Sequence, residues 1–127
     1  MNHRFHKHYT LEEARKLLPQ IRSWLAEARS IRQQLQQLDE RLTQIVSSGA
    51  DAGGSSVHKQ IKLLAELKDA LQEFEARQIQ IKDLDRGLID FPAIIAGREV
   101  FLCWEEDEDD IEFWHDLDTG FAGRERL

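Results

Sequence analysis

Cysteine is scarce in this chain of 127 residues, and Cys103 is the only one that it contains. An intramolecular disulfide is therefore excluded, and we expect a cytoplasmic protein in a reducing environment. Long apolar runs are missing as well, since no stretch approaches the roughly 18 residues of a membrane span. The polar N-terminus, "MNHRFHKHYT", is not followed by the apolar segment of a secretory signal. We expect a protein that is neither inserted into a membrane nor exported.

The sequence also lacks the short motifs that identify common catalytic sites. It has no nucleophile elbow, no phosphate-binding glycine loop and no recognised metal-ligand spacing. These absences make an enzyme less favoured than a binding module.

Positive charge is in short supply, with a net charge of -7. Residues 1–35 carry seven Lys/Arg against three Asp/Glu, residues 36–78 carry five against seven, and residues 79–127 carry five against fourteen. An acidic C-terminal third repels phosphate backbones, which argues against nucleic acid as a partner.

Apolar residues recur at steps of three and four along two segments, a pattern that predicts two amphipathic helices. Thr10 and Glu13 have the spacing of a capping box, so the first helix is expected over about residues 11–46. The second is expected over about residues 57–77, after a flexible connector, "SSGADAGGSS" at 47–56. Two such helices pack as an antiparallel hairpin. The first is longer, and its projecting apolar face needs a cover.

The last third of the chain is predicted to form strands. The segments "IQIKDL", "LIDFPAII", "REVFLCW" and "IEFWHDL" alternate or are rich in β-branched residues, which predicts an antiparallel meander of about four strands and an ordered C-terminal loop. We expect this sheet to cover the projecting end of the first helix, and a second copy of the protein is the alternative cover. Arg15, Arg22 and Arg29 recur every seven residues on that helix, and this basic stripe would attract the acidic segment. The fold is thus predicted to be α+β and a single domain, with a flexible arm (1–10), a helical hairpin (11–78) and a meander (79–127).

The stretch "KDLDRGLIDFP" begins like a calcium loop, with Asp83, Asp85 and Gly87. An EF-hand, however, has glycine at the sixth loop position and glutamate at the twelfth. Here Gly87 is fifth and Ile94 is twelfth, so the ligand set is incomplete. We interpret Asp85 to Gly87 as a hairpin turn with Gly87 at positive φ.

Taken together and in this order, "KDLDRGLIDFP", "LCW", "WHD" and "GFAGR" resemble the family of small bacterial proteins known as domain of unknown function 2203. The resemblance is specific over Ile79 to Leu127 and looser over the helices. It implies a bacterial, cytoplasmic protein with these motifs as its signature, and it implies no activity and no catalytic residue.

Asp83 and Asp90 lie on the strands that flank the predicted turn, where a purely structural turn needs no acid. In one interpretation they anchor the C-terminal tail by pairing with Arg124, whose guanidinium grips a carboxylate with two parallel bonds.

In the other interpretation Asp90, Cys103 and His115 converge on a small site, with Asp116 as an outer partner. Carboxylate, thiolate and imidazole together suit zinc or another divalent metal ion. His115 alternates in phase with Ile111 and Phe113, so its side chain is expected on the core side of the sheet. Cys103 on its own is more typical of a small buried apolar residue than of a nucleophile.

Two other polar stretches are interpreted as solvent-exposed segments. His3, His6 and His8 lie on a basic arm, where histidines are more often solvated than metal-bound. The run "EEDEDD", residues 105–110, is expected to be an exposed loop kept open by repulsion.

Two classes of function follow. The favoured one is a non-enzymatic binding or self-association module, a homo-oligomer through its helices, with a small polar site in the β region. The alternative is a metal-dependent, hydrolase-like enzyme that uses His115, Asp90 and Cys103.

Overall fold

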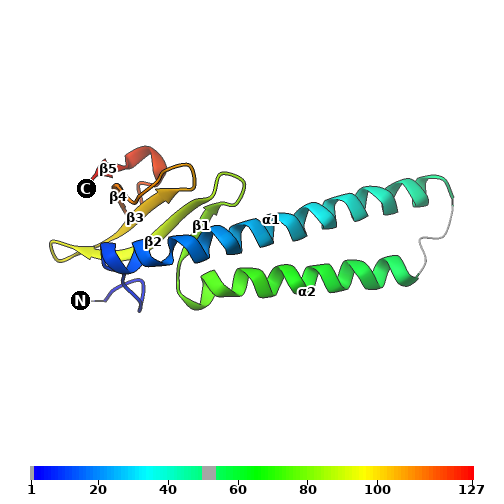
Figure 1. Cartoon of the computed structure of the whole chain (residues 1–127), viewed down its shortest axis with the longest axis horizontal. Coiled ribbons are helices and arrows are strands. Elements are labelled where there is room, and N and C mark those ends of the chain that lie inside the picture. Colours follow the sequence, from blue (N-terminus) through cyan, green and yellow to red (C-terminus); the bar gives the residue numbers. More distant parts are fainter. Residues whose placement is uncertain (1, 50–53) are drawn as a thin grey trace. The chain divides into compact units, whose positions relative to one another are not determined.

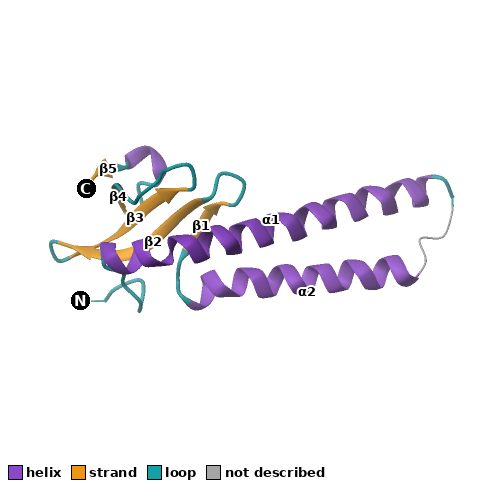
Figure 2. Ribbon diagram, viewed as in Figure 1, coloured by secondary structure: helices purple, strands orange, loops and turns teal. Residues whose placement is uncertain are grey.

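The computed structural model describes residues 2–49 and 54–127. Over these ranges two long helices precede a sheet (Figures 1 and 2). The chain divides into a sheet unit, formed by Met1–Leu25 with Glu73–Leu127, and a helical unit, Ala26–Gln72. No helix in the described part combines the length and apolar character needed to cross a membrane.

The helical unit contains most of the two helices α1 (Leu11–Ser47) and α2 (Gly54–Ala76), which run side by side as the expected hairpin (Figure 1). The first turns of α1 and the last turn of α2 belong to the sheet unit. α2 begins at Gly54, three residues earlier than the apolar period indicates. Of the predicted connector, residues 50–53 lie outside the described residues. The buried apolar side chains of this unit are Ala28, Ile31, Leu38, Leu63 and Ala70.

The capping box at the start of α1 is confirmed. Glu13 N donates to Thr10 Oγ1 at 3.1 Å, and Thr10 N donates to Glu13 Oε1 at 3.0 Å. The hydrogen bond from the Thr10 backbone lowers the pKa of Glu13. Such a cap stabilises a helix by about 1 kcal/mol. α1 continues through Pro19 to Ser47 without interruption.

The sheet is antiparallel, and its strand order follows the chain. It contains β1 (Gln80–Asp83), β2 (Leu88–Ile95), β3 (Arg98–Glu105), β4 (Phe113–Asp116) and β5 (Glu125–Arg126). The prediction of about four strands is one short, because β5 lies in the segment expected to be a loop. β5 has only two residues, too few to show any alternation, and it pairs with Phe113 and Trp114 of β4.

Glycines at positive φ close the two long hairpins. Gly87, at φ 65°, ends the turn after Leu84, as the sequence predicts. A Cβ atom on Gly87 would also lie 2.5 Å from Cβ of Glu106. Ala96 and Gly97, at φ 51° and 78°, form the two-residue turn between β2 and β3.

One face of the sheet packs on the first turns of α1, which is the cover that the sequence requires. Alternate residues of β2 and β3 project to this face. The cluster joins Ala14, Leu18, Ile21 and Leu25 of α1 to Phe74, Ile79, Ile89, Phe91, Ala93, Val100, Leu102, Trp104 and Ile111.

The N-terminal arm, expected to be flexible, makes several hydrogen bonds in the sheet unit. Tyr9 N donates to the carbonyl of Pro92 at 2.7 Å, beyond the residues of β2 that pair with β1. His6 N and Lys7 N both donate to Oε1 of Gln78 at 2.8 Å. On the edge of β2 that faces Tyr9, no strand of the described residues pairs with Pro92, so the missing N–H of this proline costs the sheet no hydrogen bond.

Candidate functional site

The face of the sheet that turns away from α1 carries the candidate site. Strand register pairs Asp90 with Cys103, and Phe101 with His115. Because neighbouring residues on a strand point to opposite faces, these side chains lie on the side opposite Phe91 and Leu102. The prediction that His115 faces the core was wrong. β4 begins only at Phe113, so Ile111 belongs to the preceding loop and does not set the phase of the strand.

Asp90 and His115 form a buried pair, with residue exposures of 1% and 2%. His115 Nε2 lies 2.9 Å from Asp90 Oδ2, and His115 Nδ1 lies 2.6 Å from the backbone oxygen of Asp116. Since a carbonyl oxygen only accepts, we assign a proton to Nδ1, which donates to it. Nε2 and Oδ2 are then two acceptors that face each other, so a second proton or another cation must lie between them.

The other carboxylate oxygen of Asp90 is unsatisfied. Among residues 2–49 and 54–127, Oδ1 of Asp90 is the one buried side-chain polar atom without a hydrogen-bond partner. Such an atom costs about 1 to 3 kcal/mol when it is left unpaired. An atom of this kind, beside a cavity, is a candidate ligand contact.

Cys103 completes the cluster. One ligand atom each from Asp90, Cys103 and His115 lies within 4.8 Å of the others, and all three residues are buried. Four-coordinate zinc, with bonds of about 2.0 to 2.3 Å, places its ligand atoms about 3.3 to 3.8 Å apart. Small side-chain movements would bring the three atoms to this spacing.

Burial and then the negative charge of Asp90 raise the pKa of the Cys103 thiol to about 12, although Arg124 lowers it in part. Cys103 is therefore a neutral thiol near pH 7 and a poor nucleophile. A bound divalent cation would displace its proton, as in other thiolate metal sites.

A cavity of about 250 Å³ opens beside these three residues. The remainder of its lining comes from β1, from the start of β2 and from the segment after β4, namely Lys82, Leu88, Leu117, Asp118, Gly120 and Phe121. The segment after β4 thus covers the second face of the sheet, while Asp90, Cys103 and His115 remain in contact with the cavity.

The other predicted site residues lie elsewhere. Asp83 Oδ1 accepts a hydrogen bond from Arg86 N at 3.1 Å and so supports the hairpin turn. The Asp116 carboxylate pairs with Arg98, and only its backbone oxygen contacts His115.

We predicted that Arg124 anchors the tail by pairing with Asp83 or Asp90. This choice of partner was wrong. Arg124 Nη1 donates to both carboxylate oxygens of Glu108, at 3.0 and 3.1 Å. Its guanidinium also lies 4.1 Å from the ring centroids of Phe113 and Phe121. The tail is held, but by the acidic loop.

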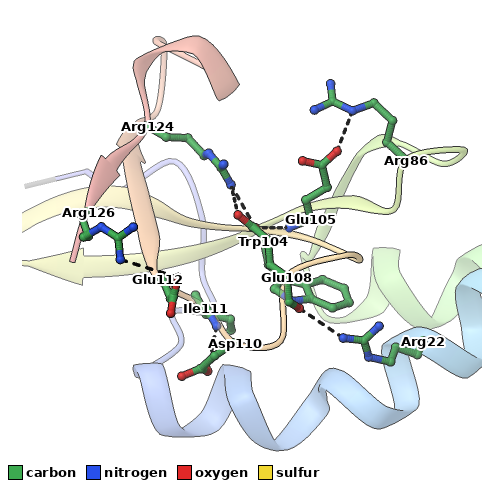
Figure 3. Close-up of polar contacts among 10 residues, drawn as sticks. All are labelled: Arg22, Arg86, Trp104, Glu105, Glu108, Asp110, Ile111, Glu112, Arg124 and Arg126. Atoms are coloured by element: carbon green, nitrogen blue, oxygen red, sulfur yellow. Dashed lines mark hydrogen bonds and ion pairs between the residues drawn. The ribbon is translucent and has the colours of Figure 1, made fainter.

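That loop is ordered by ion pairs, contrary to the open loop expected from its charge (Figure 3). Glu105 pairs with Arg86 at 2.8 Å, and Glu108 Oε1 accepts from Glu105 N at 2.8 Å. Trp104 Nε1 donates to the backbone oxygen of Glu108 at 2.9 Å. Three of the six acidic side chains, those of Glu105, Glu108 and Asp110, pair with arginines, so repulsion alone does not decide the conformation.

The attraction expected between α1 and this loop is confirmed for two arginines. Arg15 grips both carboxylate oxygens of Asp110, at 2.8 and 2.9 Å. Arg22 donates to the backbone oxygen of Glu106. It also donates to the backbone oxygen of Glu108 (Figure 3).

A second group of metal-ligand residue types lies where the arm meets β3. His3, His8 and Glu99 have ligand atoms within 4.8 Å, but this group is more exposed than the first. Glu99 already accepts from His8 Nε2, at 2.7 Å, and from the backbone N–H groups of Arg4 and Phe5. Burial raises the pKa of Glu99, but these hydrogen bonds outweigh it and lower the pKa to about 2. Its oxygens are committed to holding the arm.

Sequence reasoning missed Lys82 and Phe121 as cavity residues. Gln80 pairs with Asp90, so alternation along β1 indicates the same face for Lys82, but the register of β1 shifts between Ile81 and Asp83 and weakens this signal. Phe121 has no comparable signal, because it lies in a short 3-10 turn, Phe121–Gly123.

Comparison with protein families gives one result. A family model described as "Uncharacterized conserved protein (DUF2203)" matches residues 7–127. The chain belongs to this family, which confirms the resemblance seen in the C-terminal motifs and extends it over both helices. No curated protein and no solved structure matches the chain.

Proposed function

We propose that this member of the DUF2203 family is a binding module that holds a divalent metal ion at Asp90, Cys103 and His115. The observation that carries the proposal is the pair of facing acceptors, His115 Nε2 and Asp90 Oδ2, at 2.9 Å. A metal ion would satisfy both, and it would give the unpartnered Oδ1 of Asp90 a positive neighbour. The Asp116 carbonyl would orient His115 by accepting from Nδ1, as carbonyl oxygens behind metal-bound histidines do.

The donor set favours zinc over harder cations. One nitrogen, one sulfur and one oxygen donor suit zinc, whereas calcium and magnesium prefer oxygen alone. Three protein ligands would leave a fourth position for water or another small ligand.

A metal-dependent hydrolase built on the same residues is the alternative. Its chemistry needs a group beside the metal that moves a proton. With Asp90, Cys103 and His115 used as ligands, the titratable groups that remain in the cavity lining are Lys82 and Asp118. Asp118 is 86% exposed and pairs with Arg4, so it is poorly placed as a base. This favours binding over catalysis.

The test uses the full-length chain without a metal-binding tag, stripped with a chelator and titrated with Zn²⁺ in a calorimeter. We expect one zinc per chain, confirmed by elemental analysis, and its loss in His115→Ala. The control His58→Ala changes an exposed histidine of α2, and His8→Ala changes the second cluster; both should retain the zinc. A wild-type chain that binds no stoichiometric zinc would sink the proposal.

Self-association through the helices is a second candidate, favoured by an exposed apolar row on α2. Val57, Ile61 and Leu64 are spaced by four and three residues and are 45%, 60% and 52% exposed. That spacing is typical of the seam between paired helices, and the occupant we propose is a second copy of this chain. Light scattering across a concentration series should detect dimers that Ile61→Lys abolishes. A strict monomer at all concentrations would rule this out.

A further inference from the structure

The cavity beside Asp90, Cys103 and His115 has one cationic residue in its lining, Lys82. The Lys82 ammonium lies 5.2 Å from the ring centroid of Phe101, and that ring lies 5.4 Å from the imidazole of His115. The Phe101 ring therefore lies close both to the Lys82 ammonium and to His115, which is a proposed metal ligand. Asp118, which also lines the cavity, has its charge offset by Arg4 at 3.1 Å.

Charge balance indicates the sign of a further ligand. A divalent ion with the Asp90 carboxylate, the Cys103 thiolate and a neutral imidazole has no net charge. Lys82 then leaves a positive potential beside the open coordination position, which favours an anion.

The size and the lining of the cavity narrow the chemical class of this anion. A cavity of about 250 Å³ is smaller than the roughly 300 to 1,000 Å³ of pockets for drug-sized ligands. Leu88, Leu117 and Phe121 supply apolar walls. Such walls suit a short carbon chain better than a fully hydrated phosphate.

We propose that the open position binds a small carboxylate, with one oxygen on the metal and the other facing the Lys82 ammonium. This inference rests on the proposed metal site. It assigns Lys82 a role in binding the anion, separate from the residues that hold the metal.

The test uses the full-length chain loaded with Co²⁺, whose visible absorption reports changes in its coordination. We expect propionate to change the spectrum in a saturable way, and phosphate at equal concentration to have little effect. Lys82→Ala should weaken propionate binding about tenfold, Lys82→Arg should retain it, and the control Lys59→Ala on α2 should match wild type.

The outcomes separate the two proposals. A chain that takes up no Co²⁺ contradicts the metal site itself. A normal Co²⁺ spectrum that propionate leaves unchanged, or that phosphate changes more strongly, overturns the carboxylate assignment alone. Equal propionate affinity in wild type and Lys82→Ala overturns the role of Lys82.

Discussion

Replacing Asp90 with asparagine separates two roles of this residue, its contact with His115 in the metal-free protein and its proposed binding of the metal. With Nδ1 of His115 donating to the Asp116 carbonyl, Nε2 is free to accept from an asparagine amide in place of Asp90 Oδ2. Asp90→Asn keeps the shape of the side chain and converts two facing acceptors into a donor and an acceptor. We therefore expect the free energy of unfolding of the metal-free variant to lie within about 1 kcal/mol of that of the wild type.

Comparison with Asp90→Ala, and comparison of the protein with and without zinc, give the expected changes in the free energy of unfolding. Asp90→Ala removes one partner of a buried pair and should cost about 3 kcal/mol. For a chain of this size that lowers the melting temperature by about 10 °C. Zinc at 100 times its dissociation constant should stabilise the wild type by about 2.7 kcal/mol. Asp90→Asn, which lacks the carboxylate charge, should lose most of this gain.

The assay is urea unfolding followed by tryptophan fluorescence, with either a chelator or Zn²⁺ present. All three tryptophans, Trp24, Trp104 and Trp114, belong to the sheet unit that contains the site. Their signal therefore reports the unit in which the change is made. The reasoning is refuted if Zn²⁺ stabilises Asp90→Asn as much as wild type, or if metal-free Asp90→Asn is as unstable as Asp90→Ala.

Three further predictions follow from other residues. Glu99→Gln should destabilise the chain by about 2 to 3 kcal/mol at pH 7, because its folded-state pKa of about 2 lies below the ordinary 4.5. In urea titrations this difference should shrink as the pH falls from 4.5 to 2, and a constant difference would contradict it. Gly87→Ala should cost about 2 to 4 kcal/mol and Gly97→Ala about 1, since both have positive φ but only Gly87 has Glu106 in the way; equal melting temperatures would argue against this. Cys103 should react with a thiol reagent at pH 8 only in denaturant, because its pKa is about 12, and rapid labelling of the native chain would oppose this.

Much of the architecture follows from local patterns. The apolar period marks both helices, and Thr10 with Glu13 marks the start of the first. Gly87 and Gly97 mark the turns, because glycine accepts positive φ more readily than other residues. These signals are strong because each depends on residues close together in the chain.

Part of the site could be predicted in the same way. Asp90 lies six residues before Ala96, and Cys103 lies six after Gly97, so a two-residue turn between β2 and β3 places them opposite each other. His115 was harder, because its face depends on where β4 begins.

The partner of Arg124 could not be read from the sequence at all. The chain offers many carboxylates, six of them between Glu105 and Asp110. Which one meets the guanidinium depends on how that loop folds back over β3, and this is fixed by contacts such as the hydrogen bond from Trp104 to Glu108.

The strand order of the sheet, identical to the order of the chain, has a consequence for biosynthesis. Each new strand can pair with the one made just before it, so the sheet can grow from β1 outward. Asp90 and Cys103 would come together when the β2 and β3 hairpin closes, while His115 arrives later on a strand of four residues. The three groups meet only after β4 has been made, so a nascent chain that lacks β4 has the first two side chains without the third.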